Sequence, residues 1–320
     1  MTNANAVAIA EPLKIAAWNI ENLTVGADKD YVFLQDYVKD LEADVIALQE
    51  VDGARAAEQV FDPDDYDFYF SNRNNRQRTG FAVRKGIDVV QNPDYDALNV
   101  SGGLRYGTDI TVSTDDKQIR LLSIHLKSGC FTKALEGLGS GRGACDKLSR
   151  QVPILEDWID DRASEEIPFA VMGDFNRRLN IADDDLWDEI DDGVPANADL
   201  TKVTEGRLSD CFDGKFPQYI DHIVLDKQST DWLVPGSFEQ KLYDQPLSRE
   251  DFLSDHCAIA VTLEMPGTFP ASDFGGMGSS NRNLGTNRNN GNSPEAIFDR
   301  ISEMEIELRD LRRLIESFVN

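Results

Sequence analysis

The chain has 320 residues, with 58 acidic and 32 basic side chains, so its formal net charge is −26 at pH 7. Hydrophobic residues make up 41% and charged residues 28%, which excludes a wholly disordered chain and a small disulfide-dense one. No apolar run approaches the roughly 18 to 20 residues that a membrane span needs. Because the average field repels polyanions, a phosphate-bearing substrate would require local basic patches or metal ions.

The N-terminal tail, residues 1–12, has neither a basic start nor a long apolar run, so no secretory signal peptide is expected and the cytoplasm is the expected compartment. The cysteines instead favour a compartment outside the cytoplasm. Cys130 and Cys145 bracket a glycine-rich loop that a disulfide would stabilise, which indicates an oxidising compartment and export by a non-Sec route. Cys211 and Cys257, which flank two late strands, form a second candidate pair.

Residues 13–265 are expected to form one domain. Its short apolar runs, rich in Ile, Val, Leu and Ala, are typical of buried strands. Stretches 31–42 and 147–162 have apolar residues at helical spacing. The mixture predicts sheets covered by helices. The expected strands are 14–18, 45–48, 119–124, 168–172, 223–225 and 258–263.

The composition changes after this domain. Residues 266–293 are rich in Gly, Asn and Ser, which predicts a flexible linker. Residues 294–320 are expected to form a coiled-coil helix, and the flanking charges favour a parallel homo-oligomer through residues 297–318. An amphipathic helix folded back on its own domain is the alternative. The heptad positions are Ile297, Ile301, Met304, Leu308, Leu311, Ile315 and Phe318.

Polar side chains gather at the ends of the expected strands. Glu50, His125 and Asp174 follow strands, whereas Asp221 and His256 precede or open theirs. Leading and trailing strand ends share one edge in a mixed or antiparallel sheet, so these groups can converge on one site. All three histidines of the chain lie in these segments, which favours a functional role.

The donor set at these strand ends consists of carboxylates and side-chain amides, without a cysteine–histidine cage. Such donors favour a hard cation, Mg²⁺ or Mn²⁺, over zinc. A cation of this kind neutralises developing charge on a phosphate and helps to generate a nucleophilic water. A His held by an Asp can act as general base. The pattern therefore predicts hydrolysis of a phosphate ester.

Six segments, in order along about Lys14–Leu263, resemble motifs of the endonuclease/exonuclease/phosphatase superfamily, the DNase I-like phosphoesterases. Each is weak alone, but six in order form a strong signal. The resemblance implies an α+β fold, a four-layer α/β/β/α sandwich of two mixed sheets. The segments are Trp18–Leu23, Leu48–Val51, Ser123–Ser128, Met172–Asn176, Tyr219–Ile223 and Ser254–His256.

The resemblance also implies a metal site and a water-activating group. Glu50 would be the principal metal ligand, with Asn19, Glu21 and Asp255 as further ligands. Asp174 would orient or activate the attacking water.

The remaining catalytic roles follow from the same resemblance. His256 would be the general base, oriented by Asp221. Asn176 would hydrogen-bond the phosphate, and His125 would contact the phosphate or protonate the leaving oxygen. Arg105 lies where relatives place a phosphate-binding Arg, although its neighbours match that pattern loosely.

Several of these residues have a structural alternative. Asp174 and Asn176 would also suit a turn, and the roles of Glu21 and Arg105 stay open. His222 is expected to be structural, because strand alternation turns it away from its neighbour in the site.

Two basic regions are candidate substrate contacts. In Asn72–Arg78, Arg76 and Arg78 would bind phosphate, unless the stretch is a solvated loop. The acidic run Asp183–Asp192 is expected to be a solvated surface or a structural cation site. The second basic patch flanks the cysteine-bracketed insertion and consists of Lys127, Lys133, Arg142, Lys147 and Arg150.

Together these features predict a divalent-metal-dependent phosphodiesterase, a nuclease that hydrolyses DNA or RNA with low sequence preference. One alternative is a small-molecule or lipid phosphoesterase, similar to an inositol phosphatase or a sphingomyelinase. The other is a catalytically silent scaffold that only binds phosphate.

Overall fold

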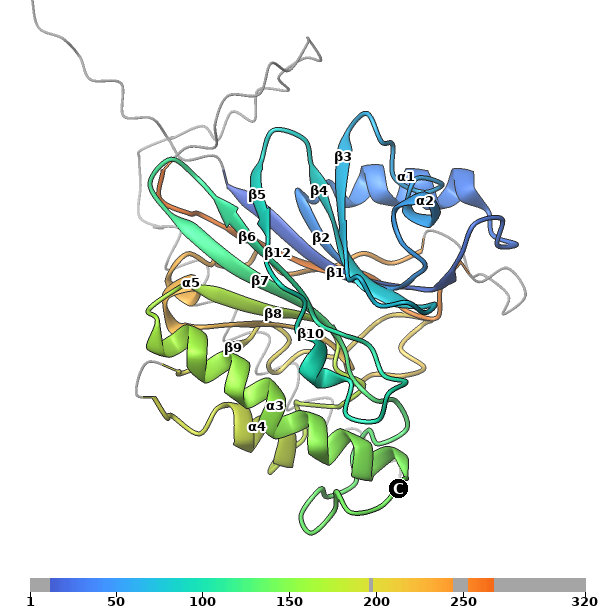
Figure 1. Cartoon of the computed structure of the whole chain (residues 1–320). Helices are drawn as coiled ribbons and strands as arrows, with labels where there is room; N and C mark the ends of the chain where they lie inside the picture. The colour runs from blue at the N-terminus through green and yellow to red at the C-terminus, as the bar shows by residue number, and fades with distance from the viewer. Residues whose placement is uncertain (1–11, 196–197, 244–252, 268–320) are drawn as a thin grey trace, which may run out of the picture. The chain divides into compact units, whose positions relative to one another are not determined.

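The computed structural model describes residues 12–195, 198–243 and 253–267, and in these ranges the strands form two six-stranded sheets (Figure 1). The first sheet runs, in spatial order, β11 (Glu239–Gln240), β12 (Ile259–Leu263), β1 (Leu13–Leu23), β2 (Val45–Val51), β4 (Arg78–Arg84) and β3 (Tyr66–Phe70). The second runs β5 (Asp88–Gln91), β6 (Thr108–Ser113), β7 (Gln118–His125), β8 (Phe169–Asp174), β10 (Asp221–Leu225) and β9 (Thr201–Lys202).

Both sheets are mixed, as predicted. β1 and β2 are parallel, as are β7 and β8, while the other pairs are antiparallel. The helices are α1 (Tyr31–Leu41), α2 (Ala54–Ala57), α3 (Ala144–Ser164), α4 (Asp185–Ile190) and α5 (Lys227–Asp231), with a 3₁₀ turn, η1, at Asp96–Leu98.

The two sheets pack face to face through alternating side chains. In β1, Ile15 and Ala17 belong to the core shared with Leu121 and Met172 of the second sheet. The intervening Trp18 joins a separate core on the outer face. The apolar runs are therefore continuous because both faces of the strand are buried.

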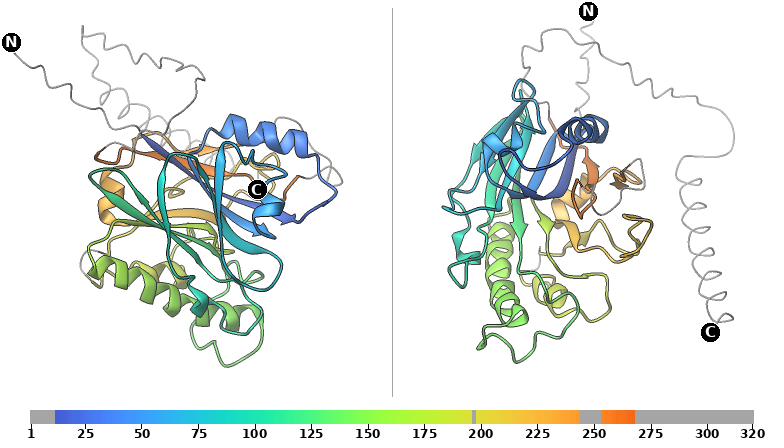
Figure 2. Two further views of the ribbon diagram at one scale, coloured as in Figure 1. Left: turned by 45° about the horizontal axis from the view of Figure 1, so that its top comes forward. Right: turned by 90° about the vertical axis from the view of Figure 1, so that its right-hand side faces the viewer.

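Helices cover the two outer faces. Leu34 and Val38 of α1 pack on the outside of the first sheet, and Val152 and Leu155 of α3 pack on the outside of the second. Figure 2 shows α1 and α3 on opposite sides of the paired sheets. The expected layering of helix, sheet, sheet and helix is thus present, although the helices are few.

The expected strands and both expected helices are confirmed, and the short outer strands were missed. The predicted coiled-coil helix, the linker from residue 268 and the tail up to residue 11 lie outside the described residues. No helix in the described part of the chain is long and apolar enough to cross a membrane.

The expectation for the acidic run needs one correction. Asp184 is buried and caps the N-terminus of α4 by accepting hydrogen bonds from the amides of Leu186 and Trp187. Its charge partner is the buried guanidinium of Arg177, 2.7 Å away. At this position the run therefore forms an internal ion pair, neither a solvated surface nor a metal site.

Both suggested cysteine pairs are disulfides. Cys130 and Cys145 close the insertion loop with Cα atoms 5.0 Å apart. Cys211 and Cys257, whose Cα atoms are 5.9 Å apart, join the loop before β10 to the residue that follows His256. Both bonds therefore lie next to predicted catalytic segments.

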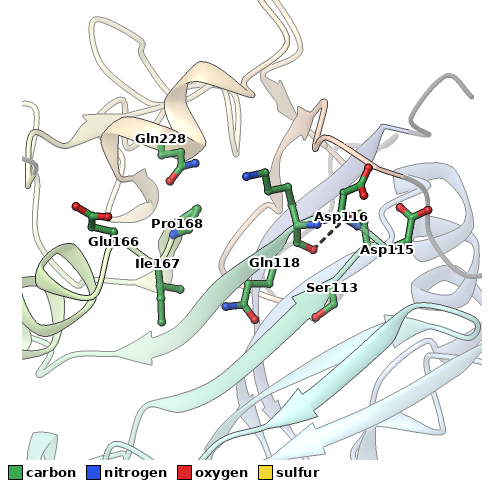
Figure 3. Close-up of a pocket in the computed structure, with 10 residues that line it drawn as sticks. Ser113, Asp115, Asp116, Gln118, Glu166, Ile167, Pro168 and Gln228 are labelled. Atoms are coloured by element: carbon green, nitrogen blue, oxygen red, sulfur yellow. Dashed lines mark hydrogen bonds between the residues drawn. The ribbon is translucent and has the colours of Figure 1, made fainter. Parts of the chain in front are cut away.

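A groove of about 410 Å³ lies at the end of the sheets away from these segments (Figure 3). It is lined by the β6–β7 turn, including Lys117, and by Pro168 directly before β8. Because β7 and β8 are parallel, the groove lies at their leading ends, whereas His125 and Asp174 lie at their trailing ends. This groove is therefore separate from the predicted catalytic edge.

A half-buried carboxyl on α3 makes the stability of the domain depend on pH. Burial, together with the charges of Asp160, Asp192 and Glu189, raises the pKa of Glu156 to about 8. The unfolded chain releases this proton near pH 4.5, so stability is lost as the pH rises from about 4.5 to 8. Glu156→Gln should therefore stabilise the domain by about 1–2 kcal/mol at pH 8.5 and leave it unchanged at pH 4, measured by urea unfolding. Glu136→Gln, in an exposed loop, is the matched control, and equal effects of both variants would contradict this account.

Candidate active site

The imidazole of His256 is fixed by a carboxylate. Its Nδ1 lies 2.7 Å from Oδ2 of Asp221, the first residue of β10. The Tyr243 hydroxyl donates to the His256 carbonyl at 2.6 Å, and the His256 amide donates to Ser254 Oγ at 3.1 Å. The ring is therefore held from both its side chain and its backbone, and Nε2 lies 3.5 Å from Asp255 Oδ1 and 3.9 Å from Asp174 Oδ2.

Asp174, at the end of β8, is held by two amides. Asn19 Nδ2 and Asn176 Nδ2 donate to its Oδ2 at 3.1 and 3.0 Å, and the Asn176 amide donates to its Oδ1 at 2.8 Å. Asn176 has φ +52°, a conformation uncommon outside glycine, which lets it fold back on the carboxylate. Asn19 belongs to the first sheet and Asp174 to the second, so this contact joins the sheets at the catalytic edge.

Glu50 is held in a strained conformation, with φ +60° at the end of β2. Its Oε2 accepts hydrogen bonds from the Asn22 amide at 3.1 Å and from Gln77 Nε2 at 2.8 Å. Its Oε1 has no hydrogen bond among the described residues and lies 3.8 Å from both Arg105 and His125. One carboxylate oxygen is thus left available for a ligand.

Gln77 was not predicted, but it joins two of the predicted groups. Its Nε2 donates to Glu50, and its Oε1 accepts from the Arg105 guanidinium at 2.8 Å. Arg105 is thereby placed beside Glu50, 3.8 Å from its Oε1. The two arginines beside Gln77 have other partners. Arg76 pairs with Asp52, and Arg78 donates to backbone carbonyls. Among the described residues, neither is bonded to a predicted catalytic side chain.

His125, at the end of β7, is buried, and its Nε2 lies 3.4 Å from Asp174 Oδ2. Burial, and then the positive charge of Arg105, lower the pKa of His125 well below its usual value. Its Nδ1 has no hydrogen-bond partner among the described residues. A neutral imidazole is suited to donating a hydrogen bond to phosphate but poorly suited to protonating a leaving group at neutral pH.

His222 has the structural role that strand alternation predicts. Its ring nitrogens bond to Thr204 Oγ1 at 2.7 Å and to the Arg177 carbonyl at 3.0 Å. Burial lowers the pKa of His222 to about 3, so the ring is neutral at ordinary pH.

The edge of the sheets where Asp174, Asp221 and His256 meet carries excess negative charge. Burial, and then Asp221, raise the pKa of Asp174 to about 7 against the opposing charge of His256. Burial alone would lower the pKa of His256. The negative charges of Asp221, Asp174 and Asp255 outweigh the effect of burial and raise this pKa to about 10. Burial of Asp174 and the negative charges around His256 therefore favour the protonated forms of both groups.

The predicted metal ligands extend this acidic cluster. Glu21 Oε2 accepts from the Asp255 amide at 3.1 Å, and burial followed by the charges of Asp255 and Glu50 raises the pKa of Glu21. Lys29 lies close enough to oppose this shift. Mutual repulsion among oxygen donors is the setting in which a hard divalent cation binds, so these residues fit such an ion.

A second donor group overlaps the catalytic residues. Potential ligand atoms of Asp174, Asp221 and His256 all lie within 4.8 Å of one another. Among the described residues, this trio is a candidate cation site, in addition to the site predicted at Glu50.

Comparison with known proteins agrees with the geometry. Residues 16–256 match the model of the Endonuclease/Exonuclease/phosphatase family. The chain belongs to this family. Among curated proteins, the sequence has no significant match.

Several solved structures share the fold of this family member. Truncated TDP2 from Caenorhabditis elegans is 18% identical, with a TM-score of 0.56, and the match covers 79% of this chain and 97% of that one. The endonuclease domain of TRAS1, a telomere-specific non-LTR retrotransposon, is 14% identical, with a TM-score of 0.51 and coverages of 79% and 98%. The 3′ phosphatase NExo from Neisseria, bound to a product DNA hairpin, is 16% identical, with a TM-score of 0.52 and coverages of 78% and 99%. The protein thus has the fold of the family's phosphoesterases.

Proposed function

We propose that the protein is a divalent-metal-dependent phosphodiesterase that hydrolyses DNA or RNA with low sequence preference. The observation that carries this proposal is the His256–Asp221 pair, which faces an Asp174 carboxylate held by two asparagines. The names of the structural neighbours, which include an endonuclease and a DNA-bound 3′ phosphatase, support a nucleic-acid substrate.

In the proposed reaction, a water bound between Asp174 and His256 attacks phosphorus. With a pKa of about 10 in the metal-free protein, His256 must first lose its Nε2 proton, which the positive charge of a cation held at this edge would favour. Nε2 of His256 then accepts the water proton, and Asp221 stabilises the resulting imidazolium through Nδ1. The new oxygen–phosphorus bond forms as the ester bond on the opposite side breaks, and the leaving alkoxide takes a proton from solvent water. Asp174 keeps the water in line because both of its oxygens are fixed by Asn19 and Asn176.

The phosphate is bound by Arg105 and His125. The Arg105 guanidinium attracts the phosphoryl oxygens, and this attraction strengthens as negative charge builds on them. Gln77 holds the guanidinium in place. The neutral His125 donates a hydrogen bond to one of these oxygens. Its lowered pKa favours this contact over the role of leaving-group acid.

The divalent cation would be held by Glu50 with Asn19, and by Glu21 and Asp255 at the same edge. When bound, Mg²⁺ or Mn²⁺ supplies charge neutralisation at the phosphate. We favour Glu50 over the trio of Asp174, Asp221 and His256, because Nε2 of His256 cannot both ligate a cation and accept a proton.

Glu50→Gln is the direct test of this site. The substitution keeps the shape and the two hydrogen bonds of the side chain but removes its charge, so the metal Kd should rise by at least about tenfold. Titration calorimetry with Mn²⁺ measures this without reference to activity. Hydrolysis of supercoiled plasmid, single-stranded RNA and bis(p-nitrophenyl) phosphate, each with Mg²⁺, Mn²⁺ or EDTA, measures the consequence. The matched control is Glu264→Gln, at the far end of β12.

The outcomes separate the alternatives. Metal-dependent cleavage of plasmid or RNA that falls in Glu50→Gln supports the proposal. Turnover of the small ester alone would replace the nuclease by a small-molecule or lipid phosphoesterase. An unchanged Mn²⁺ affinity would indicate that the cation binds at Asp174, Asp221 and His256 instead. Inactivity of the wild type on all three substrates would favour the alternative of a scaffold that only binds phosphate.

A further inference from the structure

We propose that Lys127, Lys147 and the disulfide-closed loop 130–145 form a second phosphate subsite, which binds the backbone of a polynucleotide beside the scissile phosphate. The proposal rests on the function proposed above and names an additional part of the same substrate. It assigns a role to an insertion that the catalytic reaction does not use.

Lys127 is placed by the catalytic strand itself. The amide of Leu126 donates to the Asp174 carbonyl at 2.9 Å, so the chain leaving β7 stays beside the catalytic carboxylate. The Lys127 amide then donates to Oε1 of Gln151 at 2.9 Å. Gln151 is fully buried in α3 and donates to the Leu98 carbonyl at 2.8 Å, which fixes the position of this backbone. The lysine therefore starts from a rigid point two residues after His125.

The positive charges at this point are not neutralised by the protein. Burial, and then the charges of Arg105 and Lys147, lower the pKa of Lys127. Its Nζ donates only to Oγ and the carbonyl of Ser128. Within the described part of the chain, no carboxylate forms an ion pair with Lys127 or Lys147. Lys127, which feels the positive charges of Arg105 and Lys147 and has no carboxylate partner among the described residues, is a position that an external anion would stabilise.

The insertion loop continues this surface as a rigid element. The Cys130–Cys145 bond closes it, and the buried Arg177 donates to the carbonyls of Cys130 and Lys133 at 3.0 and 2.8 Å. Asp146 Oδ1 accepts from two loop glycine amides at 3.2 and 2.9 Å. A preformed loop loses little conformational entropy on binding, which favours a recognition role.

The charges on the loop fit an extended ligand better than a small one. Lys133 and Arg142 are exposed on the loop, whereas Arg105 lies at the catalytic edge with Lys127 and Lys147 close to it. One phosphate cannot contact all of these cations. A polynucleotide offers a phosphate at each nucleotide and so can engage Arg105 and the subsite together.

The double variant Lys127→Gln/Lys147→Gln tests the subsite. The ratio of kcat/KM for a single-stranded oligonucleotide to kcat/KM for bis(p-nitrophenyl) phosphate should fall by about tenfold. The slope of log KM against log salt concentration should become shallower by about 1.4, because two phosphate contacts to a single strand are lost. Lys85→Gln/Lys117→Gln, at the opposite end of the sheets, is the matched control and should leave both quantities unchanged.

Binding without turnover separates this proposal from the proposed function. In EDTA, the fluorescence anisotropy of a labelled oligonucleotide should report weaker, less salt-dependent binding in the Lys127/Lys147 variant than in the control variant. If that difference appears in a protein that hydrolyses nothing, the subsite stands and the nuclease function fails. If wild type cleaves the oligonucleotide and the double variant matches the control in the activity ratio, salt slope and anisotropy, the subsite is overturned.

Discussion

Replacing His256 with alanine should lower kcat for phosphodiester hydrolysis by about 10²–10⁴-fold, the range that a positioned general base contributes. Nε2 of His256 faces Asp174, and Nδ1 is bonded to Asp221 at 2.7 Å. No other histidine can take over this role, because His125 belongs to the phosphate side of the site and His222 is bonded elsewhere. KM should change little, since phosphate binding depends on Arg105 and His125.

Chemical rescue distinguishes a lost base from a disturbed structure. Added imidazole should restore part of the activity of His256→Ala, since the missing side chain leaves space for it, but none of the activity of Asp174→Asn. The kcat of Asp221→Asn should fall by a factor in the same range as that of His256→Ala, because the ring loses the carboxylate that fixes its tautomer. A His256→Ala enzyme that unfolds at the wild-type temperature and retains full kcat would contradict the assignment.

The core strands could be predicted because they are buried on both faces. Val45–Leu48 is apolar without interruption, since its side chains contact α1 on one face and the second sheet on the other. The outer strands carry weaker patterns. β5, Asp88–Gln91, is mostly exposed and lies at the edge of its sheet, so no apolar run marks it.

The charged members of the site could be predicted from motifs, whereas their supports could not. Gln77 is uncharged and belongs to none of the six segments, and its place between Glu50 and Arg105 depends on a turn with φ +56°. Asp184 looked solvated because only the fold brings the Arg177 guanidinium against it. Arg76 was expected to bind substrate phosphate; its exposed side chain pairs with Asp52, two residues after Glu50, and its contact with substrate stays a prediction.

The candidate site has an acidic side and a basic side, an arrangement that would let an acidic protein bind the proposed polyanionic substrate. Glu21, Glu50 and Asp255 repel one another and would be neutralised by a cation. Arg105 and Lys127 lie on the phosphate side and repel one another in turn. A metal-bound phosphodiester would satisfy both sides at once, whereas the acidic remainder of the surface keeps a polyanion away from other positions.

Removing the Cys211–Cys257 bond, as Cys211→Ser/Cys257→Ser, should cost about 2–4 kcal/mol of folding free energy. The bond spans 46 residues of sequence, so it restricts the unfolded chain more than Cys130–Cys145, which spans 15. The unfolding temperature should fall by roughly 2–4 °C for each kcal/mol lost. Thermal unfolding followed by circular dichroism measures this, with Cys130→Ser/Cys145→Ser as the less affected control.

The same pair of variants should separate the two catalytic effects. Cys257 directly follows His256, so its bond to the loop before Asp221 helps to hold the general base against its carboxylate. Loss of this bond should therefore lower kcat on every substrate. Loss of Cys130–Cys145 should instead raise KM for polynucleotides, because that bond shapes the phosphate subsite and does not contact His256. If both variants change kcat and KM alike, the disulfides stabilise the domain as a whole and neither positions a functional element.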